Sequence, residues 1–431
     1  MAVTAGLAAN QTHGMVCAHH HLYSALARGM PAPPRTPGSF LDILELVWWR
    51  LDRALDLDTI EWSAKLGALE ALERGTTCII DHHESPSAIE GSLEVITAAC
   101  AEVGVRVNTC YGVTDRHPNT VGSGTAGSAV VGFDRAAGSE RAAGSDVADS
   151  GRVVGSGAVG SVSAGGPGAA GTDAAGSAVL GSSSAGWGSG GFDTAGPMTE
   201  GARRGLEENR RHLASGAAGM VGVHAAFTCT DETLAAAAEL AAEFGVGVHI
   251  HVAEGAADRD AAARLAPLAT EDWLIIHGVH LEDDHGLAGT LIHNPRSNMN
   301  NAVGYARPVR FANPTGLGTD GIGADMIDEF RVAYVRMRED DVTTSPDPAW
   351  RMLEVNQELF PESRNDVVTW NYEVMDPWRL AFTTGVSPLQ ITVDGETVME
   401  HGQLTKVDAV EVRAKAAEAA QRLFKKLENL I

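Results

Sequence analysis

The chain of 431 residues is 44% hydrophobic and carries a formal net charge of −24. This acidic balance argues against nucleic acid or an anionic membrane surface as a partner, because both require a basic face. Five cysteines without a CxxC pair, and an N-terminus without a signal peptide, predict a cytoplasmic protein with reduced thiols.

Eight short apolar runs that turn polar at their C-terminal ends follow one another along the chain. They lie at residues 15–23, 76–83, 105–113, 220–228, 246–254, 273–281, 289–297 and 315–323. Helix-like segments separate most of them, at residues 58–75, 88–104, 201–216, 231–245 and 256–269. Apolar runs that alternate with helices are typical of a buried parallel sheet. Eight of them predict an α/β fold, a (β/α)8 TIM-type barrel whose site lies at the C-terminal ends of the strands.

One region, residues 121–198, breaks this pattern because Gly, Ser and Ala dominate it. Such a composition cannot bury enough apolar surface to offset its conformational entropy, so we predict a disordered insertion. A lid over the site is the alternative to a tolerated surface expansion. The predicted organisation is the first part of the barrel at residues 1–120, the insertion, the rest of the barrel at 199–345, and a C-terminal part at 346–431.

Three histidines end the first predicted strand, in the stretch "VCAHHHLYSALARGM". Alternate residues of a strand share a face, so His19 and His21 point together and His20 points away, toward the helices. An HxH pair suits a divalent metal through imidazole nitrogens. Later strand ends supply possible partners, because His251 offers a third nitrogen and Asp320 a carboxylate oxygen. Such a set leaves a coordination position open for water.

Two further side chains stand at neighbouring strand ends. Glu254 lies just beyond His251, and His277 ends the next predicted strand. Both are suitable proton carriers beside a metal-bound hydroxide.

The set "HHH", "HVAE", "IIHGVH" and "LGTDG", in that order, resembles the metal-dependent amidohydrolase superfamily, in the branch of cytosine, guanine and S-adenosylhomocysteine deaminases and triazine hydrolases. The stretches "ARGMPAPP", "VWWRLD", "GTTCIIDHHESP", "GVHAAFTCTDETL", "HNPRSNMNNAVGYA" and "LGTDGIGADM" are similar, more narrowly, to SsnA-type aminohydrolases. The resemblance covers nearly the whole chain apart from the insertion. It implies one divalent metal, zinc or alternatively iron or manganese, bound by His19, His21, His251 and Asp320.

The resemblance also implies roles in catalysis. Glu254 would shuttle protons, and His277 would orient the water or stabilise the developing oxyanion. The metal would lower the pKa of its water to give hydroxide, with Asp320 accepting a proton. Glu254 would protonate a ring nitrogen of the substrate, hydroxide would add, and ammonia would depart.

Several other residues have two possible roles, one functional and one structural. His224 is a candidate for substrate binding or a core histidine, and Asn298 is a candidate for hydrogen bonding to a heterocycle or for a turn. Arg28, with Arg116 and Arg296, could attract an anionic group of the substrate or pair with the many carboxylates.

Three aromatic or imidazole side chains are expected to be structural. His249 is expected to pack in the barrel or to support the metal ligands. Trp48 and Trp49 are expected in the core or at an interface, not on a substrate.

The C-terminal part is expected to hold helices and the strands of a small, truncated β-sandwich. The stretches "VVTWNYE" and "LQITVDGETVMEHGQ" predict strands, the second with a "DGE" turn. Family members usually begin with strands that pair with these, whereas this chain reaches its HxH almost at once. A mis-assigned start codon, or a reduced sandwich that dimerises through its exposed edge, would explain the difference.

Three functions follow as hypotheses. The first is deamination of an amino-substituted purine-, pyrimidine- or pteridine-like heterocycle, a small-molecule substrate. The second is hydrolysis of a cyclic amide or a chloro-heterocycle by the same metal site. The third is a catalytically silent barrel with a binding role. We expect a homodimer or a higher homo-oligomer in each case.

Overall fold

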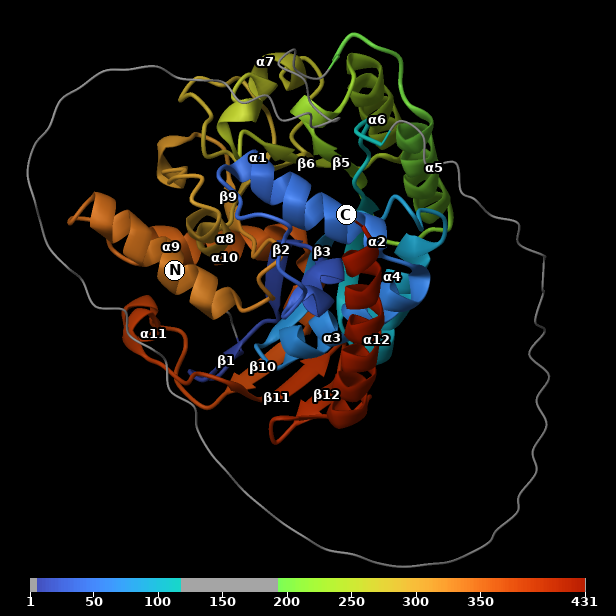
Figure 1. The fold of residues 1–431 in the computed structure, drawn as a ribbon. Helices are drawn as coiled ribbons and strands as arrows, with labels where there is room; N and C mark the ends of the chain where they lie inside the picture. Colours follow the sequence, from blue (N-terminus) through green and yellow to red (C-terminus); the bar gives the residue numbers. More distant parts are fainter. Residues whose placement is uncertain (1–5, 118–192, 431) are drawn as a thin grey trace, which may run out of the picture. The chain divides into compact units, whose positions relative to one another are not determined.

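The computed structural model describes residues 6–117 and 193–430. The chain divides into two units, of which the second, residues 123–191, lies outside the described residues. Most of the predicted insertion at 121–198 therefore also lies outside them. The first unit contains all eight predicted strands (Figure 1).

Eight parallel strands lie within the eight apolar runs, which confirms this prediction. Nearly all of their residues are buried, as expected of strands covered on both faces. The strands are β2 (Met15–His20), β3 (Thr76–His83), β4 (Arg106–Tyr111), β5 (Val221–Ala225), β6 (Val248–Val252), β7 (Leu274–His277), β8 (Thr290–His293) and β9 (Thr315–Leu317).

The eight strands form two parallel sheets, β2-β3-β4 and β5-β6-β7-β8-β9. Single parallel bridges connect the sheets at both edges: His20 pairs with Asp320, and Val113 pairs with Val223. Backbone hydrogen bonds reinforce both contacts, for example from the N–H of Thr319 to the carbonyl of His19 at 2.9 Å. The strands thus follow one another in the order of a (β/α)8 barrel, and their C-terminal ends meet at one place.

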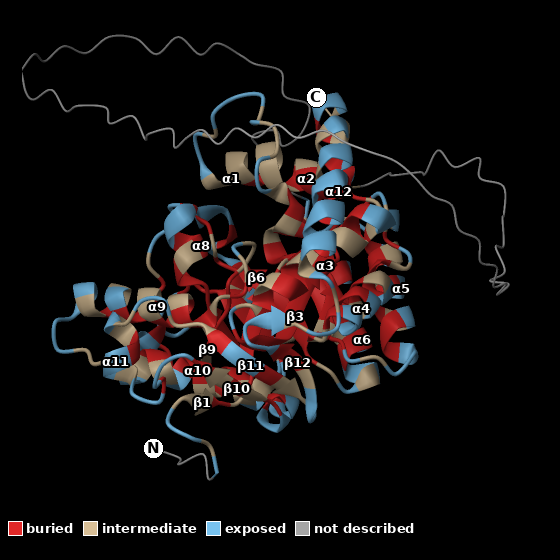
Figure 2. Ribbon diagram, turned by 90° about the horizontal axis from the view of Figure 1, so that it is seen from below, coloured by how far each residue is buried: buried red, intermediate tan, exposed pale blue. Residues whose placement is uncertain are grey.

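Helices follow most strands and cover the sheets. The helices are α1 (Phe40–Ile43), α2 (Trp49–Ala54), α3 (Leu57–Leu72), α4 (Ser92–Val103), α5 (Glu200–Ala214), α6 (Asp231–Phe244), α7 (Ala261–Leu265), α8 (Pro295–Asn300), α9 (Met326–Asp340), α10 (Asp347–Leu359), α11 (Pro377–Phe382) and α12 (Ala409–Asn429). Local sequence sets their ends. In α6 the hydroxyl of Thr230 accepts the N–H of Thr233, and Gly245 ends the helix with φ of 65°. In Figure 2 the strands are mostly buried, and exposed residues lie on the outer faces of the helices.

The segment predicted as one helix over 256–269 is broken in the structure. It forms a 3-10 turn, η4 (Ala256–Asp258), and then the short α7. The carboxylate of Asp258 fixes this turn, because it accepts the backbone N–H groups of Phe227 and Ala253. Pro267 stops α7 early, since the residue before a proline is disfavoured in a helix.

The C-terminal strands form one antiparallel sheet in the order β1-β10-β11-β12-β13. Its strands are β1 (Gln11–Thr12), β10 (Val367–Trp370), β11 (Pro388–Val393), β12 (Glu396–Glu400) and β13 (Gln403–Leu404). Asp394 and Gly395 both have positive φ, at 48° and 82°, as a tight β-hairpin requires. The predicted "DGE" turn is therefore confirmed.

The expected exposed edge is partly covered, which corrects the sequence-based expectation. The short β1 pairs with β10, and the indole N–H of Trp370 donates to the hydroxyl of Thr12 at 3.0 Å. On the barrel side, Arg106 of β4 bonds both carboxylate oxygens of Asp366 at 2.6 Å. Two residues N-terminal to β2 thus pair with one edge of the antiparallel sheet.

Two further expectations concern the whole unit. All five cysteines are buried and form no disulfide, as predicted. Among the described helices, none has the length and apolar character needed to cross a bilayer.

Candidate metal centre and active-site pocket

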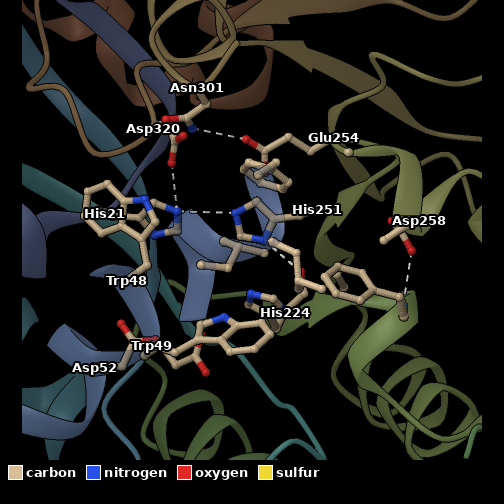
Figure 3. Close-up of a pocket in the computed structure, with 18 of the residues that line it drawn as sticks. His21, Trp48, Trp49, Asp52, His224, His251, Glu254, Asp258, Asn301 and Asp320 are labelled. Carbon is tan, nitrogen blue, oxygen red and sulfur yellow. Dashed lines mark hydrogen bonds and ion pairs between the residues drawn. The ribbon is translucent and has the colours of Figure 1, made fainter. Parts of the chain in front are cut away.

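Four polar side chains meet at the C-terminal ends of three strands, and Figure 3 shows three of them, His21, His251 and Asp320. His19 lies in β2 and His21 follows it, His251 lies in β6, and Asp320 follows β9. Their metal-binding atoms all lie within 4.8 Å of one another. Nε2 of His21 lies 3.0 Å from Oδ1 of Asp320 and 3.3 Å from Nε2 of His251. The structure thus brings together the four residues that the sequence singled out as metal ligands.

The backbone at the edge between β2 and β9 positions three of these side chains. The carbonyl of Asp320 accepts the N–H of His21 at 3.3 Å, and the carbonyl of His19 accepts the N–H of Asp320 at 3.2 Å. Asp320 has a positive φ of 55°, a conformation that costs energy in a residue with a side chain. This turn directs the carboxylate of Asp320 to the imidazoles of β2.

Hydrogen bonds on the far sides of the imidazoles fix which nitrogen faces the centre. Nδ1 of His21 contacts the carbonyl of His82 at 2.6 Å, and Nδ1 of His251 contacts the carbonyl of His224 at 2.7 Å. A carbonyl only accepts hydrogen bonds, so each Nδ1 carries a proton and each Nε2 presents a lone pair in the neutral ring. Two such lone pairs 3.3 Å apart beside a carboxylate form a suitable site for a cation.

The third imidazole has an equivalent arrangement. Nδ1 of His19 lies 2.9 Å from Nε2 of His249, so His249 supports a metal-ligand candidate. Nε2 of His19 is buried without a hydrogen-bond partner, as expected of an atom that faces a metal. The donor set of three imidazoles and one carboxylate therefore fits a divalent metal such as zinc.

Charge interactions at the centre agree with this fit. Burial alone would lower the pKa of His21, but the hydrogen bond and charge of Asp320 raise it to about 9. Burial alone would raise the pKa of Asp320, but His19 and His21 hold it well below its usual range. The site therefore stabilises positive charge next to an ionised carboxylate.

His20 faces away from this centre. Its Nδ1 lies 2.7 Å from the carbonyl of Asp320 and 3.0 Å from the hydroxyl of Thr319. Its ring is buried on the opposite side of β2 from the other two histidines of the triplet.

Glu254 and His277 form a second pair beside the metal candidates. Nε2 of His277 lies 3.5 Å from Oε2 of Glu254, and the binding atoms of both lie within 4.8 Å of Asp320. Burial raises the pKa of Glu254 to about 7, although the nearby His277 opposes this shift. A carboxyl group with such a pKa can both give and accept a proton near neutral pH.

Helix α8 and Asn301, the residue after it, contact three side chains of the site, those of His277, Asp320 and Glu254. Oδ1 of Asn298 lies 2.8 Å from Nδ1 of His277, and the hydroxyl of Ser297 donates to Oδ2 of Asp320. The amide of Asn301 donates to Oε1 of Glu254 at 3.4 Å. Asn298 was a candidate for hydrogen bonding to the substrate or for a turn. Its buried Oδ1 contacts His277, and its Nδ2 has no hydrogen-bond partner among the described residues.

A cavity of about 220 Å³ opens beside the metal candidates. Its walls are largely aromatic, with the side chains of Tyr23, Phe40, Trp48, Trp49 and Phe227. His224 also lines it, and Nδ1 of that ring lies 2.8 Å from the hydroxyl of Thr228. A planar heterocycle fits such a pocket, because aromatic side chains stack on flat rings.

The two tryptophans lie in the core, as expected, and also border the pocket. Trp49 is buried and Trp48 packs partly buried against the core, while both line the pocket (Figure 3). The helical segment Phe40–Ala54 contains a π-helical turn, η2 (Leu44–Trp48). This turn shifts the helical register, so the position of both indoles does not follow a regular 3.6-residue period.

The three arginines considered for an anionic substrate are all paired with carboxylates. Arg28 is exposed and bonds Glu70 at 2.8 Å, away from the pocket. Arg296 bonds Glu329 at 2.6 Å. Arg116 lies buried behind the pocket wall and bonds Asp52 and Glu84, as described below.

Asp52, Glu84 and Ser297 were not predicted as site residues from the sequence. Asp52 lies on α2, far from any strand end, and only the packing of that helix on the barrel mouth reveals its position. Glu84 directly follows β3, so the rule that strand ends carry the site could have found it.

Known proteins resemble this chain in sequence. The sequence model of the amidohydrolase family matches residues 12–353, most of the chain. A 5-methylthioadenosine/S-adenosylhomocysteine deaminase of Symbiobacterium thermophilum is 30% identical over 275 residues, covering 51% of this chain and 63% of the relative. A 5'-deoxyadenosine deaminase of Methanopyrus kandleri is 23% identical over 97% of this chain and 86% of the relative. The match to the first relative spans less than two thirds of that relative's length. The same is true of a 5-methylthioadenosine/S-adenosylhomocysteine deaminase of Syntrophomonas wolfei, of which the match covers 58%.

Solved structures share the fold. A zinc-bound adenosine deaminase of Xanthomonas campestris has a TM-score of 0.65 at 16% identity, covering 96% of this chain and 85% of its own. The zinc complex of atrazine chlorohydrolase TrzN from Arthrobacter aurescens has a TM-score of 0.64 at 16% identity, covering 95% and 88%.

Proposed function

The chain belongs to the amidohydrolase family, and on this basis we propose that it is a metal-dependent hydrolase that deaminates an adenosine-like nitrogen heterocycle. One observation carries the proposal. Four metal-binding atoms lie within 4.8 Å of one another, and Glu254 and His277 stand beside them at 3.5 Å. The names of the relatives, which are deaminases of adenosine-like nucleosides, support the choice of substrate class.

The proposed metal is zinc, held by Nε2 of three histidines and by the carboxylate of Asp320. Zinc prefers such nitrogen and oxygen donors, and it is present in the two solved neighbours. When bound, a divalent metal supplies Lewis-acid activation of a water molecule at neutral pH.

The remaining chemistry falls to side chains of the chain. Glu254, with a pKa raised to about 7, gives a proton to a ring nitrogen and makes the adjacent carbon electrophilic. Asp320, ionised in the folded protein, accepts a proton from the attacking water. Nε2 of His277 faces Glu254, where it would orient the water and stabilise the charge that develops. The proton that Asp320 took from the water then passes to the leaving amine, the hydroxyl proton of the adduct returns to Glu254, and the C–N bond breaks to release ammonia.

The pocket walls orient the substrate. The aromatic side chains hold the heterocycle flat, and the ring of His224 provides a polar contact. The carbonyl of His224 accepts the Nδ1–H of His251 at 2.7 Å. A shift of His224 on substrate binding would therefore also move His251, a proposed metal ligand.

A panel of amino-heterocycles tests the proposal. Zinc-loaded protein should release ammonia from adenosine, 5'-deoxyadenosine or 5-methylthioadenosine, and Glu254→Gln should lower kcat by about a hundredfold or more. Consumption of a cyclic amide or a chloro-heterocycle without ammonia would favour the second hypothesis. Failure of every compound with a fully loaded site would contradict the proposed deamination.

We also infer that the eight strands close into a (β/α)8 barrel. Backbone hydrogen bonds at both edges, such as those of Thr319 with His19 and of His224 with Val113 at 2.9 Å, support closure. The five-stranded sheet would be the reduced sandwich of the family, with β1 as the remainder of its N-terminal strands.

A further inference from the structure

Two carboxylates line the pocket at a distance from the reacting groups. Asp52 comes from α2 and Glu84 from the residue after β3, and their side chains are 1% and 4% exposed. Figure 3 shows Asp52 and Glu254 on opposite sides of the pair formed by His21 and His251. A molecule that reacts beside Glu254 therefore extends toward Asp52.

One guanidinium serves both carboxylates. Nη2 of Arg116 lies 2.8 Å from Oδ2 of Asp52 and also bonds Oε1 of Glu84. The guanidinium of Arg116, whose side chain is 1% exposed, stacks 4.6 Å from the ring centre of Trp49. Two buried negative groups thus share a single positive one, so the cluster carries a net negative charge when both carboxylates are ionised.

Hydrogen bonding within the cluster is incomplete. Oδ1 of Asp52 is buried and has no well-aligned hydrogen-bond partner in the described part of the chain, although the hydroxyl of Tyr23, also on the pocket wall, interacts with this carboxyl group. A buried carboxylate oxygen without a donor is costly. Burial, followed by the charge of Glu84, raises the pKa of Asp52 well above its ordinary value. A ligand with a positively charged hydrogen-bond donor would supply both the missing hydrogen bond to Asp52 and the missing positive charge.

No lysine or arginine of the described residues lines this pocket, and His21, the lining imidazole whose pKa is raised, is paired with Asp320. The other carboxylates of the pocket are Glu254 and Asp258. Arg28 and Arg296, the remaining candidates for an anionic substrate group, bond Glu70 and Glu329 elsewhere. The end of the pocket at Asp52 and Glu84 therefore sets two carboxylates against one guanidinium, a balance that disfavours anions and favours cations.

We propose that Asp52 and Glu84 form a subsite for a cationic group of the substrate, an ammonium or amidinium, at the end of the pocket opposite Glu254. The inference rests on the proposed function, because it names the substrate class of the same site. An amidinium matches the subsite well, since it brings planar N–H donors to Oδ1 of Asp52 and a flat face to the aromatic walls. A neutral group would supply the donor but not the charge, and an anion would supply neither.

Calorimetric titration of the zinc-loaded protein with benzamidinium and with its neutral analogue benzamide tests the subsite directly. The two probes have nearly the same shape and differ in charge. We expect benzamidinium to bind at least about tenfold more tightly, the effect of one favourable charged hydrogen bond. Equal affinities, or tighter binding of benzamide, would overturn the proposal.

Single substitutions test whether Asp52 and Glu84 cause the preference for benzamidinium. Asp52→Asn keeps the side-chain shape, removes one negative charge, and should reduce the preference for benzamidinium to less than about threefold. Glu84→Gln should act in the same direction, and it serves if Asp52→Asn does not fold. Glu418→Gln removes the same charge from the exposed surface of α12 and should leave the preference unchanged. An undiminished preference in both pocket variants would place the cation elsewhere and contradict the assignment.

The outcomes separate this subsite from the proposed function. If no heterocycle yields ammonia but benzamidinium binds through Asp52, the deaminase proposal fails and the subsite stands. If ammonia is released but benzamide binds as tightly as benzamidinium, the subsite fails and the deaminase proposal stands.

Discussion

The three consecutive histidines differ in what holds the other side of each ring. His21 and His19 have their Nδ1 atoms bound to a carbonyl and to another imidazole, which leaves each Nε2 for a metal. His20 uses its Nδ1 for the carbonyl of Asp320, on the opposite face of the strand. Residue type alone therefore does not decide metal binding, because the position of each ring and its hydrogen-bond partner also contribute.

Replacement of each histidine by alanine separates these roles. His19→Ala and His21→Ala should each reduce bound zinc to less than about a tenth of an equivalent, because three ligands do not hold the metal as four do. His20→Ala should keep nearly a full equivalent, as measured by elemental analysis after dialysis. Equal losses in all three variants would contradict the alternation of side chains along β2.

Asp81 gives a pH dependence to stability. Its carboxylate accepts the backbone N–H of Leu22 and the hydroxyl of Thr109, yet burial raises its pKa to about 6. The folded protein therefore binds more protons than the unfolded chain between pH 4 and 6, and this group makes stability fall as the pH rises through that range.

Asp81→Asn removes this titration while it keeps the acceptor for Leu22. Between pH 4 and 6, the free energy of unfolding of the wild type should fall relative to the variant by up to about 1.4 kcal/mol per pH unit. Urea unfolding at several pH values measures this difference. Parallel curves for the two proteins would show that Asp81 is ionised throughout.

At the level of single residues, the sequence predicted the strand-end groups because side chains alternate on a strand and barrel sites lie at strand ends. It did not predict that Asn298 would contact His277, because the direction of an amide on a short helix depends on tertiary packing. Asp52 was missed for a related reason, since a π-helical turn changes which face of its segment meets the barrel.

Among the elements, α8 has an unusual share of the site. In six residues it supplies partners to His277 and Asp320, and Asn301 just after it bonds Glu254. A helix that holds a candidate metal ligand and two candidate proton carriers keeps their mutual positions fixed, which the proposed catalysis requires.

Asn298→Ala tests this role of α8. Loss of the nearer partner of Nδ1, which leaves Asn294 at 3.4 Å, should let the His277 ring rotate, and kcat should fall about ten- to a hundredfold with little change in KM. Zinc content should remain at the wild-type level, which distinguishes a positioning defect from loss of the metal. Met299→Ala, at an exposed neighbour on the same helix, is the control and should change neither quantity.

The strands and most helices could be predicted from periodicity, since buried parallel strands are continuous apolar runs. The segment 256–269 could not, because Asp258 bonds the backbone of two distant strand ends and so replaces helical hydrogen bonds. Local pattern does not contain such long-range contacts.

Across the whole described unit, the C-terminal sheet is attached to the barrel through a buried ion pair. Asp366 is fully buried and receives two hydrogen bonds from Arg106, a third from the hydroxyl of Thr77, and a fourth from the N–H of Asp394. The carboxylate of Asp394 also approaches Arg106 at 2.9 Å, but its side chain is 58% exposed.

These two carboxylates form a matched pair for a stability test. Asp366→Ala leaves a partly buried guanidinium and a buried hydroxyl without their partner, and should lower the free energy of unfolding by about 3 kcal/mol. Asp394→Ala should have only a small effect, because an exposed ion pair contributes little. Chemical denaturation measures both, and similar losses would show that the sheet is not attached through Asp366.

The oligomeric state stays a prediction at this scale. A homodimer is expected to have twice the chain mass of 45.0 kDa in light scattering. A single-chain mass at micromolar concentration would contradict it.

Two of the metal candidates, His19 and His21, lie at the end of the first parallel strand, β2, and Asp320 follows the last one, β9. The fourth candidate, His251, lies in β6. During synthesis on the ribosome, His19 and His21 emerge long before Asp320, so a nascent chain exposes an incomplete HxH chelate for most of its elongation. Firm binding of the proposed metal is therefore expected only after the segment with Asp320 has left the exit tunnel and joined the first parallel strand. A chain truncated before residue 320 would carry an open and exchangeable site.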